Sequence, residues 1–87
     1  MHLKYNFQMM DLHNQTVAVP IDESADGFHG VIKLNKTAAF VFNLLKEDIT
    51  EEAIVDAMMS KYEGSREQME ADVKTYIAEF EERGLLA

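Results

Sequence analysis

The chain has 87 residues, which suffices for one small domain with a modest core, so we expect residues 1–87 to form a single domain. Sixteen acidic residues against eight basic ones give a net charge of −8, which disfavours nucleic acid as a partner because its phosphate backbone is also negative. There is no cysteine for disulfides or thiolate metal sites, no cleavable signal segment and no run of roughly 18 apolar residues, so we expect a cytoplasmic protein that does not enter a membrane.

The first third of the chain alternates between apolar and polar residues, which is typical of strands with one buried face. Residues 3–9 follow this pattern and predict a first strand, and residues 17–21 resume it and predict a second. The polar residues 13–15 between them suit a tight turn. Pro20 cannot donate a ladder hydrogen bond, so we place it at a sheet edge or at the end of its strand.

The run GVIKLNKTAAFVFNLL changes from a strand pattern to a helical pattern in its middle. After a polar loop at residues 22–30, residues 31–34 alternate like a third strand, whereas residues 36–46 repeat apolar side chains at helical spacing. Asn35 lies between them, and its side chain can accept a hydrogen bond from a backbone N–H of the first helical turn. We therefore predict that Asn35 ends the strand and caps the first helix.

Two further helices are predicted in the C-terminal half. Thr50 is a good N-cap before an acidic first turn, and Gly64 ends this second helix. Ser65, with Gln68 three residues later, forms a capping box for a third helix. The apolar seam of the third helix consists of Met69, Val73, Ile77 and Phe80, with Tyr76 beside it. Three strands followed by three helices predict an α+β fold, winged-helix-like, in which a three-stranded antiparallel sheet packs against the helices.

No combination of residues in the sequence has the spacing of a catalytic or metal site. The histidines His2, His13 and His29 have no second ligand at a helical spacing. The GFHG run at residues 27–30 lacks the glycine spacing and the lysine of a phosphate-binding loop. Adjacent glutamates in the helices point mostly to solvent, whereas acid–base catalysis requires a shifted pKa. We therefore expect no enzyme activity, no metal and no cofactor.

The methionines allow two interpretations. In the first, those that fall on or beside apolar seams fill gaps in the core; these are Met9, Met10, Met58, Met59 and Met69. In the second, one or two of them line a surface that adapts to a flexible partner.

Two segments of the chain, VIKLNKTAAFVFNLL and KYEGSREQMEADVKTYIAEFEERGLL, carry a series of motifs in a specific order. The motifs are LNKTA at residues 34–38, Phe42, Tyr62, Asp72-Val73 and GLL at residues 84–86. In this order and spacing the chain closely resembles the PqqD-like family, from about residue 17 to residue 86. These proteins are small recognition elements that bind the precursors of ribosomally synthesised and post-translationally modified peptides.

The resemblance implies a non-catalytic peptide chaperone. In the family, the leader segment of the precursor adds as an extra strand to the edge of the sheet at the third strand, against the third helix. The complex presents the precursor to a modifying enzyme, often a radical S-adenosylmethionine (radical SAM) enzyme. Carried over to this chain, the strand edge comprises Val31, Ile32, Lys33 and Leu34, and the facing wall comprises Met69, Asp72, Val73, Tyr76 and Ile77.

These residues also have purely structural interpretations. Ile32 and Leu34 can be core residues that act only through their backbone, and Lys33 can protect an exposed edge from aggregation. Asp72 can pair with Lys74 or another surface charge. For the whole chain, a structural subunit of a maturation enzyme and a winged-helix DNA-binding regulator remain alternatives, although the net charge of −8 disfavours the second. Exposed edge strands leave both a monomer and an edge-strand dimer open.

Overall fold

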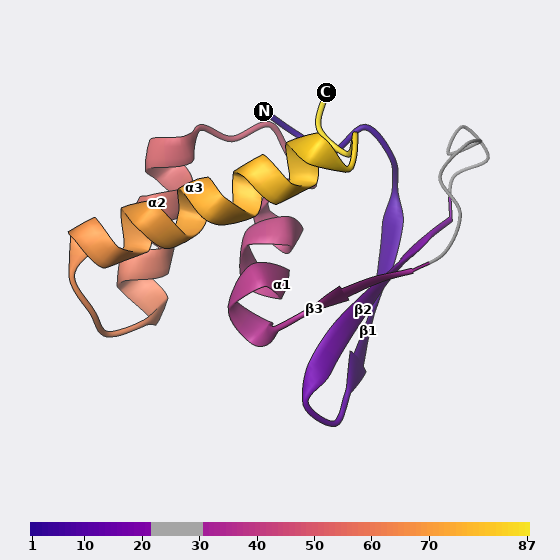
Figure 1. Cartoon of the computed structure of the whole chain (residues 1–87), viewed down its shortest axis with the longest axis horizontal. Coiled ribbons are helices and arrows are strands. Elements are labelled where there is room, and N and C mark those ends of the chain that lie inside the picture. Colours follow the sequence, from indigo (N-terminus) through magenta and orange to yellow (C-terminus); the bar gives the residue numbers. More distant parts are fainter. Residues whose placement is uncertain (22–30) are drawn as a thin grey trace.

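The computed structural model describes residues 1–21 and 31–87, and in these residues it has one sheet and three helices (Figure 1). In chain order the elements are β1 (Phe7–Leu12), β2 (Gln15–Pro20), β3 (Ile32–Leu34), α1 (Lys36–Leu44), α2 (Glu51–Lys61) and α3 (Arg66–Glu82). The predicted α+β order of strands and helices is confirmed, whereas winged helix is only a loose description of it. The expected polar loop at residues 22–30, with His29 and the GFHG run, lies outside the described residues.

The sheet is antiparallel and has the strand order β1-β2-β3. Leu12 and Gln15 face each other across a two-residue turn at the predicted position, and Leu34 of β3 lies opposite Thr16 of β2. Pro20 is the last residue of β2, which agrees with its predicted place at a strand end. β2 is therefore the central strand of the sheet, and β1 and β3 are its edge strands.

The first strand begins later than the alternation predicted. It starts at Phe7 instead of Leu3, because the backbone before it bonds to other partners. The Leu3 N–H donates to the Leu45 carbonyl at 2.9 Å, and the Lys4 N–H donates to the Leu85 carbonyl at 2.8 Å. The side chain of Leu3 is nevertheless buried. The alternation thus predicted the burial of this residue but not the partners of its backbone.

Each helix begins at the cap residue that the sequence predicted. The side-chain oxygens of Asn35, Thr50 and Ser65 each accept a hydrogen bond from the backbone N–H three residues later, at 2.7, 3.1 and 3.1 Å. Such caps satisfy N–H groups that have no partner within the helix. Because Asn35 directly follows β3, its cap also fixes the point at which the strand turns into α1.

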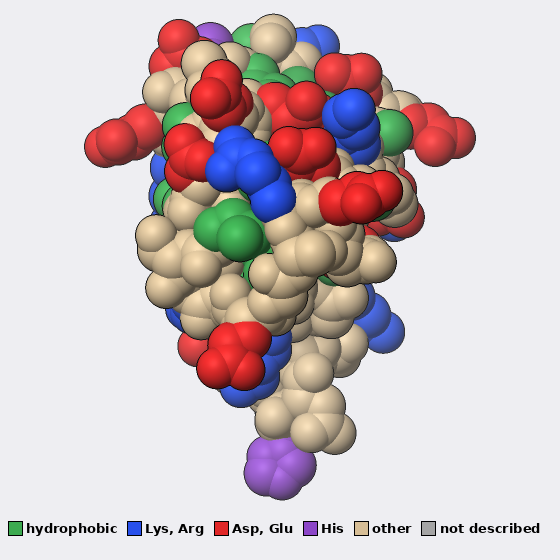
Figure 2. Space-filling model, turned by 90° about the vertical axis from the view of Figure 1, so that its left-hand side faces the viewer, with side chains coloured by type: hydrophobic (Ala, Val, Ile, Leu, Met, Phe, Trp, Pro, Cys, Tyr) green, Lys and Arg blue, Asp and Glu red, His purple; other side chains and the backbone are tan. Residues whose placement is uncertain are grey.

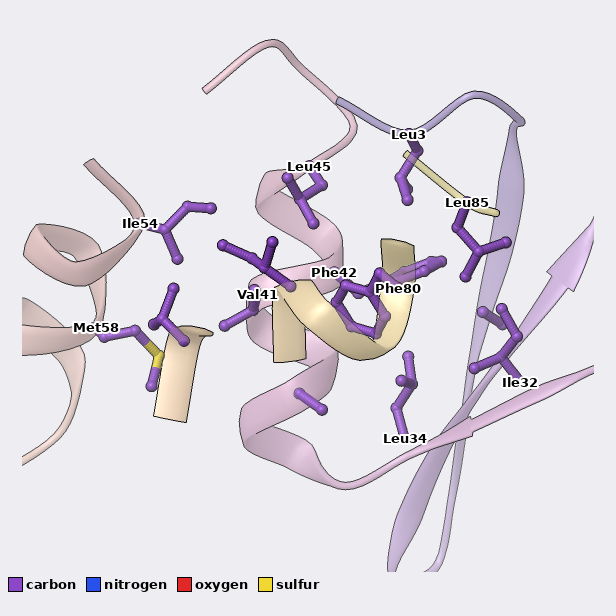
Figure 3. Packing of buried hydrophobic residues seen from close by; sticks show 14 of the residues in the cluster. Leu3, Ile32, Leu34, Val41, Phe42, Leu45, Ile54, Met58, Phe80 and Leu85 are labelled. Atoms are coloured by element: carbon purple, nitrogen blue, oxygen red, sulfur yellow. The ribbon is translucent and has the colours of Figure 1, made fainter. Parts of the chain in front are cut away.

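The helices lie on one face of the sheet and enclose the core with it (Figures 1 and 3). Phe42 of α1 is fully buried and lies between Phe7 and Phe80, with edge-to-face ring centroids 5.1 and 5.3 Å away. Ile32 and Leu34 of β3 belong to the same buried cluster. Edge-to-face pairs stabilise a core beyond the area that they bury. This aromatic stack therefore joins β1, α1 and α3 into one unit.

Candidate functional site

β3 has an open strand edge. One side of the strand pairs with β2, and no strand of residues 1–21 or 31–87 pairs with its other side. In an antiparallel sheet, alternate residues direct their backbone N–H and C=O groups to each side of a strand, so some of these groups in β3 face away from β2. An edge of this kind can accept an extended chain as an additional strand.

The predicted edge residues place their side chains on the two faces of the sheet. Ile32 and Leu34 are only 2% and 6% exposed and point into the core, which confirms their interpretation as core residues. Lys33 and Val31 are exposed and point away from the helices. At the edge itself, these four residues offer a ligand their backbone N–H and C=O groups.

The predicted wall residues form one stripe along α3. Met69, Val73 and Ile77 are buried, and Asp72 and Tyr76 beside them are partly exposed. Because residues three and four positions apart share one side of a helix, these five positions are neighbours on its surface. A ligand can reach the side chains of Asp72 and Tyr76 without displacing the core. Met69, Val73 and Ile77 pack in the core beside them.

A hollow of about 230 Å³ lies where the beginning of α3 approaches the beginning of α1. Two predicted wall residues, Met69 and Asp72, line it together with Thr37 of α1. The other lining residues are Met58, Tyr62, Glu63, Gly64 and Gln68. Since Thr37 follows the end of β3 by three residues, the hollow lies beside the first turn of α1, into which β3 leads.

Two local features fix the shape of this hollow. Gln68 Nε2 donates to Asp72 Oδ1 at 3.0 Å, so Asp72 is held by its own helix and its partner is not Lys74. Gly64 has a φ of 150°, and a Cβ added there would lie 3.3 Å from Met69 Cε. A glycine therefore allows the turn between α2 and α3 to come close to Met69.

The sequence did not predict that Thr37, Tyr62, Gly64 and Gln68 share a site. Each of them had a local explanation in a cap or at a helix end, and no periodicity connects residues of three different helices. The available signal was the family resemblance, because its two segments contain all four residues. Only the packing of α1, α2 and α3 shows that they meet.

A larger hollow, of about 490 Å³, lies between the sheet and the helices α1 and α2. Lys61 Nζ lies 4.8 Å from the centre of the Phe40 ring there, in a cation–π contact. Asp11 Oδ1 accepts a hydrogen bond from the Thr16 hydroxyl at 2.8 Å. Both contacts are internal to the protein: the first joins α2 to α1, and the second joins β2 to β1.

The titratable groups with shifted pKa values lie in surface ion pairs outside the β3 edge and the α3 stripe. The Met1 ammonium, 2.7 Å from Asp48 Oδ1, lowers the pKa of Asp48. Asp56 accepts a hydrogen bond from Arg66 at 2.8 Å and raises the pKa of that guanidinium. Within the described parts of the chain, no three His, Asp or Glu side chains gather so as to hold a metal ion.

The charged surface is mostly acidic where α2 and the start of α3 lie. Figure 2 shows carboxylates there, with only a few lysine or arginine side chains between them. A surface of this sign repels a phosphate backbone, which argues against a DNA-binding role for these helices. No helix that the structure describes is long and apolar enough to cross a lipid bilayer.

Comparison with known proteins gives a family and two structural neighbours. The sequence matches the family model of Coenzyme PQQ synthesis protein D (PqqD) over residues 9–86. The structure titled TbiB1 in complex with the TbiA(beta) leader peptide has a TM-score of 0.73 and 20% identity, and the match covers 99% of this chain and 94% of that one. Lasso peptide synthetase B1 complexed with the leader peptide has a TM-score of 0.68 and 20% identity, over 97% and 93% of the two chains. No curated protein sequence matches the chain.

Proposed function

The chain belongs to the PqqD family, and we propose that it is a non-catalytic recognition element that binds the leader segment of a ribosomally synthesised precursor peptide. The family model, which matches residues 9–86, confirms the resemblance in the sequence motifs. Two proteins of the same fold were solved with a leader peptide bound, and this supports the same kind of ligand here.

The leader adds as a fourth strand to the open edge of β3. The observation that carries this proposal is the edge itself, since β3 has no second partner strand in the described part of the chain. The strand ends three residues before Thr37, which lines the hollow. In strand addition, main-chain hydrogen bonds provide affinity and pockets for alternate side chains provide specificity. A leader affinity in the micromolar range would correspond to about −8 kcal/mol.

The backbone of residues 31–34 pairs with the leader in this proposal. Met69, Val73 and Ile77 support the facing wall, because they are buried in the core beneath it. Asp72 and Tyr76 contact the leader with their side chains, because they are the partly exposed members of the stripe.

The bound precursor is then presented to a modifying enzyme, for which we propose a radical SAM enzyme, as is frequent in the family. The protein itself needs no cofactor for this role, because it supplies binding and orientation while the enzyme supplies the reaction. We propose the cytoplasm as the place of action, since the precursor is made by ribosomes there.

Leader binding is tested with a candidate precursor, taken from a short open reading frame sought among the genes that neighbour the gene of this chain. Its leader segment is synthesised with a fluorescent label, and anisotropy is measured with the wild type and with the double variant Asp72→Ala/Tyr76→Ala. We expect the double variant to bind at least about 10-fold more weakly, which corresponds to about 1.4 kcal/mol. The matched control Glu81→Ala, an exposed residue of α3 that points away from Asp72 and Tyr76, should stay within about twofold of the wild type.

Two results would contradict the proposal. Equal affinities of the wild type and the double variant would place the leader elsewhere on the protein. A folded wild type that gives no signal with the leader would favour the structural-subunit alternative instead.

A further inference from the structure

The face of the sheet that points away from the helices is unusually apolar. We call it the outer face; in β1, β2 and β3 it consists of Gln8, Met10, Leu12, Gln15, Val17, Val19 and Lys33. Ile21 after β2 and Val31 before β3 continue it. Met10, Val17 and Lys33 lie in one row across the three strands. The large apolar side chains that are strongly exposed in residues 1–21 and 31–87 all belong to this face: Met10 (48%), Leu12 (49%), Val31 (51%) and Ile21 (61%).

This concentration of apolar side chains marks an interaction surface. Single exposed apolar residues are normal, but a contiguous patch on a protein surface usually contacts another molecule. The charge distribution adds to the argument, because the chain has a net charge of −8 while the outer face, in its described residues, carries Lys33 and no carboxylate. Asp11 of β1 points to the other face and bonds to Thr16. The molecule that covers this face should therefore be apolar, with a carboxylate opposite Lys33.

The outer face is continuous with the proposed peptide edge. A leader paired with β3 would direct alternate side chains to each face of the sheet, so half of them would lie beside Val31 and Lys33. β1 and β2 have six residues each and β3 has three, so at a spacing of about 4.8 Å and a rise of about 3.3 Å per residue the strands give a footprint of only about 240 Å². A stable complex buries about 800 Å² on each partner. A fourth strand widens this footprint, so the loaded protein offers a larger docking surface than the free one.

We propose that the outer face, extended by the bound leader, is the docking surface for the enzyme that modifies the precursor. The inference rests on the proposed function, because it requires the leader as the fourth strand. The enzyme contacts Met10, Leu12 and Val31 with apolar side chains and places a carboxylate opposite Lys33. A second copy of this chain fits this face less well, since each copy carries a charge of −8 and neither outer face supplies a carboxylate for the Lys33 of the other.

The test uses the double variant Met10→Thr/Leu12→Thr. Both residues lie on β1, two strands away from the leader edge, and both are about half exposed. Threonine suits a strand, so the fold should be retained. If the double variant melts early, the single variant Met10→Thr replaces it. The control Glu52→Gln changes an exposed residue of α2 on the helical side of the molecule.

The measurement is calorimetric titration with a candidate modifying enzyme, sought among the genes that neighbour the gene of this chain, in the presence and absence of the synthetic leader. We expect the enzyme to bind the loaded wild type at least about 10-fold more tightly than the free wild type. The double variant should lose at least about 10-fold in enzyme affinity while its leader affinity stays within about twofold. The control should match the wild type in both titrations.

Each other outcome overturns the docking proposal. Equal enzyme affinity of the double variant and the wild type, or no affinity of the enzyme for the loaded wild type, would show that the enzyme does not use the outer face. A wild-type dimer in sedimentation that the double variant abolishes would assign this face to a second copy. Failure of the leader to bind the wild type would instead contradict the proposed function, so the two failures are distinguishable.

Discussion

The two faces of the sheet are both apolar, but helices cover only one of them within residues 1–21 and 31–87. Ile32 and Val31 are neighbours in sequence, yet Ile32 is 2% exposed under the helices and Val31 is 51% exposed on the outer face. Phe7 on the inner face packs against Phe42 of α1, which in turn packs against Phe80 of α3. The outer face has no helix over it in the described part of the chain (Figure 1).

The inner face therefore contributes to the stability of the fold, whereas the outer face is available for recognition of another molecule. Apolar area that is removed from water stabilises the folded state, so the buried inner face contributes to the free energy of folding. The outer face and the edge of β3 contribute little to it, and they stay available for other molecules. Substitutions on the two faces should therefore have different consequences.

The largest effect is expected for Phe42→Ala. Phe42 is fully buried at the centre of the aromatic stack, so truncation should lower the free energy of unfolding by about 3–5 kcal/mol through lost packing and a cavity. Urea denaturation followed by circular dichroism measures this loss. The outer-face control Met10→Ala should change the same quantity far less, and a similar loss for both variants would remove the distinction between the faces.

A closer comparison uses the neighbours Ile32 and Val31. Ile32→Ala should cost about 2–5 kcal/mol because its side chain is buried in the core. Val31→Ala should cost less than about 1 kcal/mol because its side chain is half in solvent. Thermal and urea unfolding of the two variants should separate them clearly. Equal costs would mean that something covers the outer face in the free protein.

The cap between β3 and α1 should have a moderate effect. Asn35→Ala removes the acceptor of the 2.7 Å hydrogen bond from the Ala38 N–H and should cost about 1 kcal/mol. Asn35→Asp keeps an acceptor at the same position and should recover most of this loss. If the alanine and aspartate variants unfold at the same urea concentration, the cap does not hold the corner between the open strand and the helices.

The smallest effect is expected at Asp48, which lies between α1 and α2 and serves as a reference. The Met1 ammonium lowers the pKa of Asp48, so the ion pair stabilises the fold above the ordinary aspartate pKa, and this stabilisation is lost as the pH falls through the lowered pKa. An NMR titration of the carboxyl group should show a pKa below the usual range. In Asp48→Asn the pH dependence of the melting temperature in acid should become slightly flatter, and an unchanged slope would exclude a contribution from this pair.

Local patterns predicted most of the fold. The caps at Asn35, Thr50 and Ser65 were predicted correctly, because each depends on residues within one helical turn. The start of β1 was predicted wrongly, since the Leu3 backbone bonds to residue 45, which no local pattern can indicate. The exposure of Met10 could not be predicted from local patterns either. Periodicity placed it on or beside an apolar seam, and only the tertiary structure shows that its side chain is half exposed.

The candidate site was predictable in part. The family resemblance indicated the β3 edge and the α3 stripe, and the structure brings Met69 and Asp72 together with Thr37 around one hollow. The other lining residues come from the ends of α2 and α3, so their proximity depends on helix packing and not on spacing in the sequence. Whether the leader occupies this edge stays a prediction.

The most direct test is an amide NMR titration of the isotope-labelled protein with the unlabelled leader. Our account predicts chemical-shift changes concentrated in residues 31–34 and along residues 69–77, with the amides of β1 little affected. Changes confined to β1 or to the hollow around Lys61, or no changes in a well-folded spectrum, would contradict strand addition at β3.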